Sequence, residues 1–258
     1  RVIMTKKNGT QTTCLRLLKA RKICLFNSSS CPKRLDVYVV KLAPELCLDE
    51  ISFILENYQI MIDRDFVFYQ EQKNKLYKTW FKNQKGVFLF CGSALLALSQ
   101  VVLAQSGDEE VKFITESNKT ITAKIEPNTG KPQISIELND SYMKLDHLSW
   151  LTQSNVLINK KLSLEELKRI ELKDVLEIPN KLPMQSLGAY CCFHQEEEVV
   201  HLRYFSPWHG RDEDFATLSI FEYLPLLLKK KKQYIVIQNN SLCFFAQADQ
   251  KKVVLREK

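Results

Sequence analysis

Alternating apolar and polar positions predict short β-strands along much of this chain, and longer apolar runs predict buried helices. Two apolar strands, 66–70 and 190–194, are each followed by a charged turn and by a second strand that ends in an aromatic pair, Trp80-Phe81 or Tyr204-Phe205. The expected helices cover 95–103 and 219–228, and each precedes a strand pair, 111–115 with 120–124 or 234–238 with 242–247. The pattern therefore predicts an α+β fold.

The same pattern occurs twice along the sequence. When the chain is shifted by 124 residues, Phe66 falls on Tyr190 and, without a gap, Gly86 falls on Gly210. Further upstream, 48–51 resembles 164–167 at a shift of 116 residues, and both segments predict helices with acidic first turns. Chance similarity between strand patterns is the alternative. We predict two copies of one α+β unit, each with strands wrapped round a central helix.

This repeat divides the chain into parts. We expect an N-terminal extension at 1–19, a first lobe at 20–137, a linker at 138–150 and a second lobe at 151–258, with the C-terminal strands free to cross between lobes. Two similar lobes that face each other create a cleft, which is the usual place for a ligand site. We therefore expect the functional site between the lobes.

One uncharged apolar stretch, 87–104, has the 18 residues at which a membrane span must be considered. Polar or small residues interrupt its middle, among them Gly92, Ser93 and Ser99. The stretch also divides into a short strand followed by a buried helix. We expect that division and no contact with a membrane.

The composition is that of a folded globular protein. The 258 residues are 45% hydrophobic and 26% charged, with a formal net charge of +7. Four consecutive lysines at 229–232 either form a patch for nucleic acid or anionic lipid, or complement the negative end of a helix dipole in solvent. Because no aromatic residues are interleaved with them, we favour the second interpretation and expect no nucleic-acid partner.

Cysteine, histidine and glycine usage excludes several kinds of site. The eight cysteines do not suggest a disulfide framework, since Cys191 and Cys192 are adjacent and others lie inside apolar runs. We expect reduced thiols and a cytoplasmic location. Neither the cysteines nor the four histidines have metal-ligand spacing, so we expect no metal and no other cofactor. The 258 residues include only 7 glycines, fewer than half of the number expected from an average usage of about 7%. This shortage argues against glycine-rich loops that bind phosphate.

Four segments carry a resemblance to one family. Residues 203–219 (RYFSPWHGRDEDFATLS) resemble the R-x-F-x-P…G…E-D-P-x-T-G-S-A run of the PhzF-like family of phenazine biosynthesis. Residues 91–97 (CGSALLA) resemble its C-G-H-A-T-L-A, 57–67 its N-L-S-E-T-A-F-V, and 234–241 the strand that ends in its Q-x-S-x-R-G-G. The resemblance spans about 20–258. It implies the diaminopimelate-epimerase fold, which has two pseudo-symmetric lobes, each a barrel-like sheet round a central helix, and it implies a homodimer.

The resemblance also implies site residues. The family's glutamate, a general acid/base that moves a proton between carbons of a small amino or hydroxy acid, corresponds to Asp63, and its histidine corresponds to Ser93. Asp214, Thr217 and Ser219 fall on polar positions that bind substrate. Without the family, we favour the interpretation that Asp63 is part of a solvated turn before the strand 66–69.

Several family positions differ in this sequence. Phe215 and Leu218 replace a proline and a glycine, and the late R-G-G is missing. Serine cannot titrate near neutral pH as the family's histidine does. A mechanism with two thiols needs a cysteine in each lobe; Cys91 is present in the first, whereas 214–219 contains none.

Two functions remain open from the sequence. One is a PhzF-like isomerase or epimerase that transfers a proton on a small carboxylic acid at a degenerate site, with Asp63 as acid/base. The other is a catalytically inactive relative that uses the same scaffold for binding. Whether the chain is an enzyme depends on which of the two is right.

Overall fold

The computed structural model describes most of the chain, namely residues 5–8, 11–14, 20–25, 35–57, 65–83, 86–153, 155–160, 163–181, 187–209, 211–214, 217–228, 233–238, 242–249 and 251–257. The chain divides into two compact units, Arg1–Leu25 with Asp36–Pro132 and Phe26–Leu35 with Gln133–Lys258. The segment 138–150, expected as a linker, contains β11 (Tyr142–Lys144) and the start of β12 (Ser149–Thr152). Strands therefore continue through this part of the second unit.

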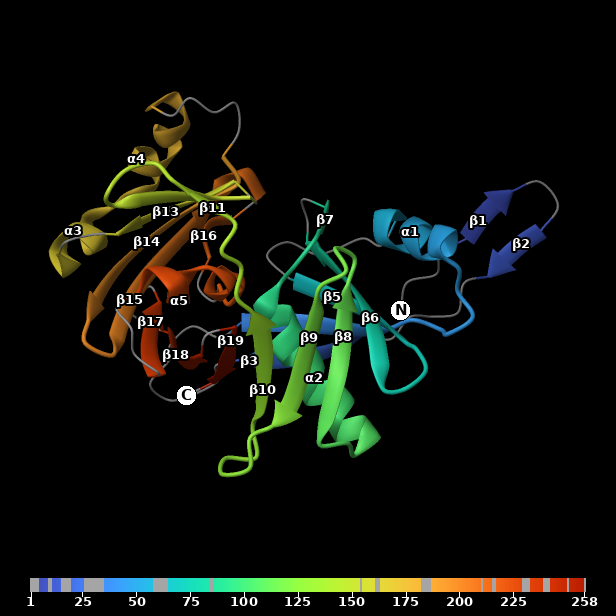
Figure 1. The fold of residues 1–258 in the computed structure, drawn as a ribbon. Helices are drawn as coiled ribbons and strands as arrows, with labels where there is room; N and C mark the ends of the chain where they lie inside the picture. The colour runs from blue at the N-terminus through green and yellow to red at the C-terminus, as the bar shows by residue number, and fades with distance from the viewer. Residues whose placement is uncertain are drawn as a thin grey trace. The chain divides into compact units, whose positions relative to one another are not determined.

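The first unit contains a mixed sheet, a separate two-stranded hairpin and two helices (Figure 1). Its elements are β1 (Thr5–Asn8), β2 (Gln11–Cys14), β3 (Ala20–Leu25), β4 (Leu35–Lys41), α1 (Leu48–Asn57), β5 (Asp65–Glu71), β6 (Leu76–Asn83), β7 (Gly86–Phe88), α2 (Gly92–Ser106), β8 (Glu110–Thr115) and β9 (Thr120–Ile125). β1 and β2 form a hairpin in the segment that the sequence marks only as an extension.

Strand pairing in the first unit is a mixture of parallel and antiparallel. β4 runs parallel to β5, β5 antiparallel to β6, β6 antiparallel to β7, β6 parallel to β8, and β8 antiparallel to β9. Parallel neighbours need a crossover connection. Helix α1 supplies the crossover between β4 and β5, and α2 supplies the one between β6 and β8.

The two helices of the first unit bury different sets of apolar side chains. α1 packs Ile51, Ile54 and Leu55 against Phe66 and Phe68 of β5. α2 is buried on almost every side, as expected for a helix that is apolar all round, and it contacts β3, β5, β8 and β9. α2 is therefore the central helix that the sequence predicts.

The second unit contains more strands and shorter helices. Its elements are β10 (Pro132–Glu137), β11, β12, β13 (Val156–Lys160), α3 (Leu164–Arg169), α4 (Leu172–Leu176), the 3-10 helix η1 (Ile178–Lys181), β14 (Ala189–Glu196), β15 (Val199–Ser206), η2 (Pro207–His209), β16 (Arg211–Asp214), η3 (Ser219–Glu222), α5 (Leu224–Leu227), β17 (Gln233–Gln238), β18 (Leu242–Ala248) and β19 (Lys252–Glu257). α3 and α4 pack Leu167 and Val175 against Tyr190, Cys192 and Phe205.

The order of pairings in the second unit repeats that of the first. β13 runs parallel to β14, β14 antiparallel to β15, β15 antiparallel to β16, β15 parallel to β17, and β17 antiparallel to β18. β19 then pairs with both β18 and β10. The prediction of an α+β fold with two pseudo-symmetric lobes is confirmed at the level of topology.

One detail of the predicted repeat is wrong. Phe68 pairs with Trp80, whereas Cys192, which lies 124 residues after Phe68, pairs with Arg203 and not with Tyr204. The turn of the second hairpin is thus one residue shorter, and the repeat has a gap there. The residues opposite Phe68 and Phe66 are Trp80 and Lys82, and those opposite Cys192 and Tyr190 are Arg203 and Phe205. The cation and the aromatic ring have exchanged places between the two units.

The helix predicted at 219–228 is also corrected by the structure. It is divided into η3 and the four-residue α5, whose first turn contains Pro225. Proline has no N–H to donate to the preceding turn, and its ring obstructs that turn, so a helix cannot continue through it undisturbed. The central helix of the second unit is therefore short.

The apolar stretch 87–104 divides as predicted into the end of β7 and most of α2. α2 ends at Gly107, which has φ 69° and donates its N–H to the carbonyl oxygen of Leu103. Glycine accepts this left-handed conformation without steric cost. No helix in the described ranges is long and apolar enough to cross a membrane.

Candidate functional site

The first unit presents its candidate residues where α2 begins. Cys91 is the N-cap, in an extended conformation, and its carbonyl oxygen accepts the N–H of Leu95. The Cys91 Sγ and the Ser93 Oγ lie 3.3 Å apart, and Ser93 is buried. The Ser93 hydroxyl is therefore in contact with the thiol two residues earlier.

Asp63, the predicted acid/base, lies outside the described residues. Its segment begins after the end of α1, where buried Lys82 donates from Nζ to the carbonyl oxygens of Leu55 and Glu56. Burial lowers the pKa of Lys82, and the carboxylate of Glu56 opposes that shift. The cation thus satisfies carbonyl groups that a helix end otherwise leaves without donors.

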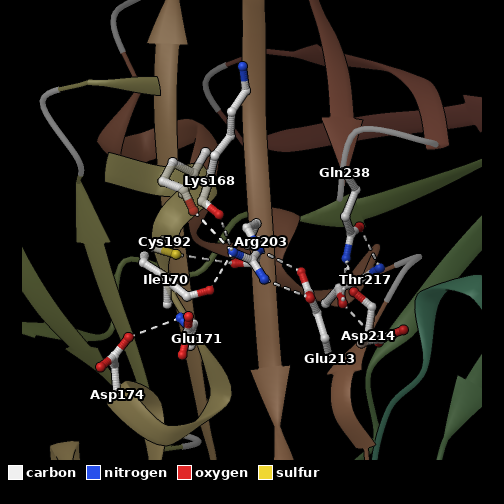
Figure 2. A network of polar contacts seen from close by, with 11 residues as sticks. Lys168, Ile170, Glu171, Asp174, Cys192, Arg203, Glu213, Asp214, Thr217 and Gln238 are labelled. Atoms are coloured by element: carbon white, nitrogen blue, oxygen red, sulfur yellow. Dashed lines mark hydrogen bonds and ion pairs between the residues drawn. The ribbon is translucent and has the colours of Figure 1, made fainter. Parts of the chain in front are cut away.

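In the second unit, Arg203 of the R-x-F-x-P segment lies at the centre of a polar network (Figure 2). Its Nε and Nη2 donate to the two carboxylate oxygens of Glu213, at 2.8 and 2.9 Å. Its Nη1 donates to the carbonyl oxygens of Leu167, Lys168 and Ile170, at 3.2, 3.3 and 2.7 Å. The Glu213 hydrogen bonds raise the pKa of Arg203. This arginine therefore ties β16 to the C-terminal end of α3.

Asp214, the last residue of β16, is held at both carboxylate oxygens. Oδ1 accepts from Nη1 of Arg211 at 3.2 Å, and Oδ2 accepts from the hydroxyl of Thr217 at 2.8 Å. The Thr217 N–H donates to Oε1 of Gln238 at 2.9 Å, and Nε2 of Gln238 donates to the Asp214 carbonyl oxygen. Two predicted binding residues, Asp214 and Thr217, are thus brought together, and the Thr217 hydroxyl is hydrogen-bonded to the Asp214 carboxylate (Figure 2).

Ser219, the third predicted residue in this unit, is half-buried and begins η3. The N-cap residue of η3, Leu218, is buried and has φ −83°, which any L-residue adopts without strain. Leu218 therefore causes no backbone strain at this position. Phe215 lies outside the described residues.

The structure brings the predicted residues together only in part. Ser93 belongs to the first unit and contacts Cys91, whereas Asp214 and Thr217 contact each other in the second. Sequence reasoning missed Arg211 and Gln238 as partners. The only signal for Gln238 was its place in the strand that resembles the family's Q-x-S-x-R-G-G. Among the described residues, no cluster of three or more His, Cys, Asp or Glu could hold a metal ion.

Comparison with known proteins supports the fold. No protein-family model and no curated protein matches the sequence. Solved structures do match. One is a phenazine-biosynthesis PhzC/PhzF protein from Clostridium difficile, with a TM-score of 0.67, 15% identity, and coverage of 93% of this chain and 95% of that one. A PhzF-family protein from Enterococcus faecalis has a TM-score of 0.63, 12% identity, and coverage of 91% and 92%.

A hydroxyproline epimerase also matches. The enzyme from Agrobacterium vitis, with bound trans-4-hydroxy-L-proline, has a TM-score of 0.56, 10% identity, and coverage of 92% of this chain and 86% of that one. At such identities the likeness is one of fold, and it extends over nearly the whole length of each chain. This chain therefore has the fold of the PhzF-family proteins and of related epimerases.

Proposed function

We propose that this protein is a PhzF-like isomerase or epimerase that transfers a proton on a small amino or hydroxy acid at a degenerate site. The observation that supports the proposal most is the fold match across both units, which includes an epimerase with a bound hydroxylated amino acid. We propose Asp63 as acid/base, with Ser93, Asp214, Thr217 and Ser219 binding or orienting the acid. A cytoplasmic homodimer that needs no cofactor completes the proposal.

The proposed step is a proton exchange. Asp63 removes a proton from carbon next to the carboxylate, and the proton returns to that carbon's other face or to a neighbouring carbon. No electron transfer is required. An aspartate in place of glutamate places the carboxylate about 1.5 Å further from the substrate, a distance that can reduce the rate about 100-fold. We therefore expect slow turnover.

Deuterium wash-in tests this function. The protein is incubated in D₂O with a panel of amino and hydroxy acids that includes trans-4-hydroxy-L-proline, and incorporation at the α-carbon is followed by NMR. We expect incorporation with at least one compound, and its loss in Asp63→Ala. Asp49→Ala, which removes an exposed carboxylate of α1, is the matched control and should leave the rate unchanged.

A second candidate function is favoured by the polar network of the second unit. Arg203, Glu213, Asp214 and Thr217 all bond to one another or to nearby backbone. These contacts stabilise the unit, and they support an inactive relative whose scaffold binds a partner or a small carboxylic acid. The absence of exchange with every compound, together with ligand-dependent thermal shifts, would favour this function and contradict the first.

A further inference from the structure

The side chain of Gln238 is fully buried at the end of β17. Tyr234 and Val236, which point to the same face of the strand, are also buried, and they make that face largely apolar. In the sheet, Gln238 pairs with Leu202 of β15 and Leu242 of β18. An amide in such a place costs free energy unless its oxygen and nitrogen find hydrogen-bond partners.

Those partners all belong to one segment, 214–217. The Gln238 Oε1 accepts the Thr217 N–H at 2.9 Å, and Nε2 donates both to the carbonyl oxygen of Asp214 and to Oγ1 of Thr217, the latter at 3.3 Å. One buried side chain is therefore hydrogen-bonded both to Asp214 at the end of β16 and to Thr217, two residues before η3 (Figure 2).

These bonds determine where the hydroxyl hydrogen of Thr217 points. Because Oγ1 accepts a hydrogen bond from Gln238, the hydroxyl hydrogen is directed to Oδ2 of Asp214, at 2.8 Å. Arg211 donates to the other oxygen of the same carboxylate at 3.2 Å. Asp214 is thus linked, through its carbonyl oxygen and through the Thr217 hydroxyl, to an amide that lies 24 residues away in the sequence.

We propose that Gln238 is a positioning residue: it fixes the backbone at Asp214 and at Thr217 and, through the Thr217 hydroxyl, the direction of the Asp214 carboxylate. The consequence for catalysis rests on the proposed function, whereas the structural effect does not. Gln238 itself need not touch the substrate. Thr217 likewise acts on Asp214, with its hydroxyl and amide both used inside the protein.

Hydrogen exchange of the Thr217 amide, measured by NMR on the full chain, tests the structural effect. In Gln238→Leu the amide loses its acceptor, and we expect about tenfold faster exchange relative to the amides of β14. The control is Gln70→Leu. Gln70 is also buried, and its Nε2 donates to the carbonyl oxygens of Ala43, Pro44 and Leu46 at 3.0, 3.3 and 2.9 Å. The Gln70→Leu substitution should leave the exchange rate of the Thr217 amide unchanged. Equal acceleration of that exchange in both variants would overturn the proposal.

Gln238→Glu provides a second test that does not depend on the folding of the leucine variant. Burial raises the pKa of a carboxyl group at this position, since desolvation disfavours its charged form. When protonated, it can accept from Thr217 and donate to the Asp214 carbonyl as glutamine does. When ionised, it has no hydrogen to donate, and its negative charge faces the Asp214 carbonyl oxygen, so the repulsion displaces the side chain from both residues and weakens the Thr217 hydrogen bond. We expect exchange at Thr217 close to wild type at about pH 5 and about tenfold faster at about pH 8, after correction for the intrinsic rate. A pH-independent ratio contradicts the proposal.

The link to catalysis is tested on any compound that shows deuterium wash-in. We expect Gln238→Leu to lower kcat more than it raises KM and Gln238→Glu to recover activity towards acidic pH, while Gln70→Leu follows the wild-type profile. An unchanged rate in Gln238→Leu would contradict the positioning role. If no compound exchanges, the proposed function fails, and the Thr217 measurement still decides whether Gln238 fixes the segment.

Discussion

At the scale of single residues, His201 is the most unusual side chain in the described structure. Its Nδ1 is buried and is the one buried side-chain nitrogen or oxygen there that lacks a hydrogen-bond partner. It lies on β15 opposite His194 of β14, whose Nε2 is 3.1 Å from Glu196. Burial lowers the pKa of His201; Glu196 opposes this shift, while His194 and Lys168 add to it.

This burial makes stability depend on pH. The pKa of His201 is lowered from 6.5 in the folded protein, so the unfolded chain binds the proton first as pH falls. The histidine therefore costs stability increasingly below about pH 6.5, until the folded pKa is reached. We expect the Tm of His201→Gln to fall less than that of wild type between pH 7.5 and 5.5. His209→Gln, at an exposed position, should follow wild type, and identical curves for all three proteins would contradict the assignment.

Only some of the site was predictable residue by residue. Asp214 and Thr217 were found through the resemblance of 203–219 to a family motif, and their contact agrees with their closeness in sequence. Gln238 acts through Thr217 and Asp214, 21 and 24 residues away, and Arg203 contacts carbonyl groups 33 to 36 residues away in addition to Glu213. Such partners depend on strand order and register, which a single sequence does not specify.

At the scale of elements, both units use a cation from the second strand of a hairpin to complete a helix end. Lys82 of β6 donates to carbonyl oxygens in the last turn of α1, and Arg203 of β15 does the same for α3. Arg203 differs in having a carboxylate partner, Glu213, with both side chains only 16% exposed. Because solvent screens two half-buried charges less than two exposed ones, we expect a larger coupling energy between Arg203 and Glu213 than between charges at the surface.

A double-mutant cycle measures the difference. For Arg203→Met and Glu213→Gln we expect a coupling energy of about 1–3 kcal/mol from urea unfolding. The comparison pair is Lys41 and Glu71, 2.9 Å apart and 52% and 51% exposed, for which we expect less than about 0.5 kcal/mol. Equal coupling in both cycles would show that Arg203 acts through its carbonyl contacts alone.

The elements themselves were predicted well where periodicity is strong. The hairpins at 66–81 and 190–205 and the helix within 87–104 appear where the pattern placed them. The helix at 219–228 did not, because Pro225 interrupts a run whose apolar pattern alone favours a helix. The turn between β14 and β15 is one residue shorter than the turn between β5 and β6. The sequence pattern did not predict this difference, because the length of a turn does not alter the alternation of apolar and polar residues in the strands on either side.

At the scale of the whole molecule, each unit has an apolar cluster of its own, and α2 is buried along most of its length. Leu95, Leu96 and Leu98 of this helix have no exposed surface. The two-unit organisation was predictable because the repeat appears in the sequence. The boundary between the units was harder to place, since strands β11 and β12 occupy a polar segment that resembles a linker.

Shortening a buried side chain of α2 should destabilise the protein strongly. We expect Leu98→Ala to lower the free energy of unfolding by about 2–5 kcal/mol, because it removes a fully buried side chain and leaves a cavity. Leu48→Ala, at the exposed first position of α1, should change it by less than about 0.5 kcal/mol. Chemical denaturation of both variants tests this, and a small loss for Leu98→Ala would mean that the helix is not part of a packed core.

The exchanged positions of cation and ring in the two units affect how such chains can be compared. Trp80 and Lys82 in one unit take the sheet positions of Arg203 and Phe205 in the other. A score based on residue identity counts two mismatches there. A score based on contacts counts a match, because Lys82 and Arg203 each donate to carbonyl oxygens at the C-terminal end of a helix before their hairpin. Searches for distant repeats would therefore gain sensitivity by comparing the contacts that side chains make rather than their positions in an alignment.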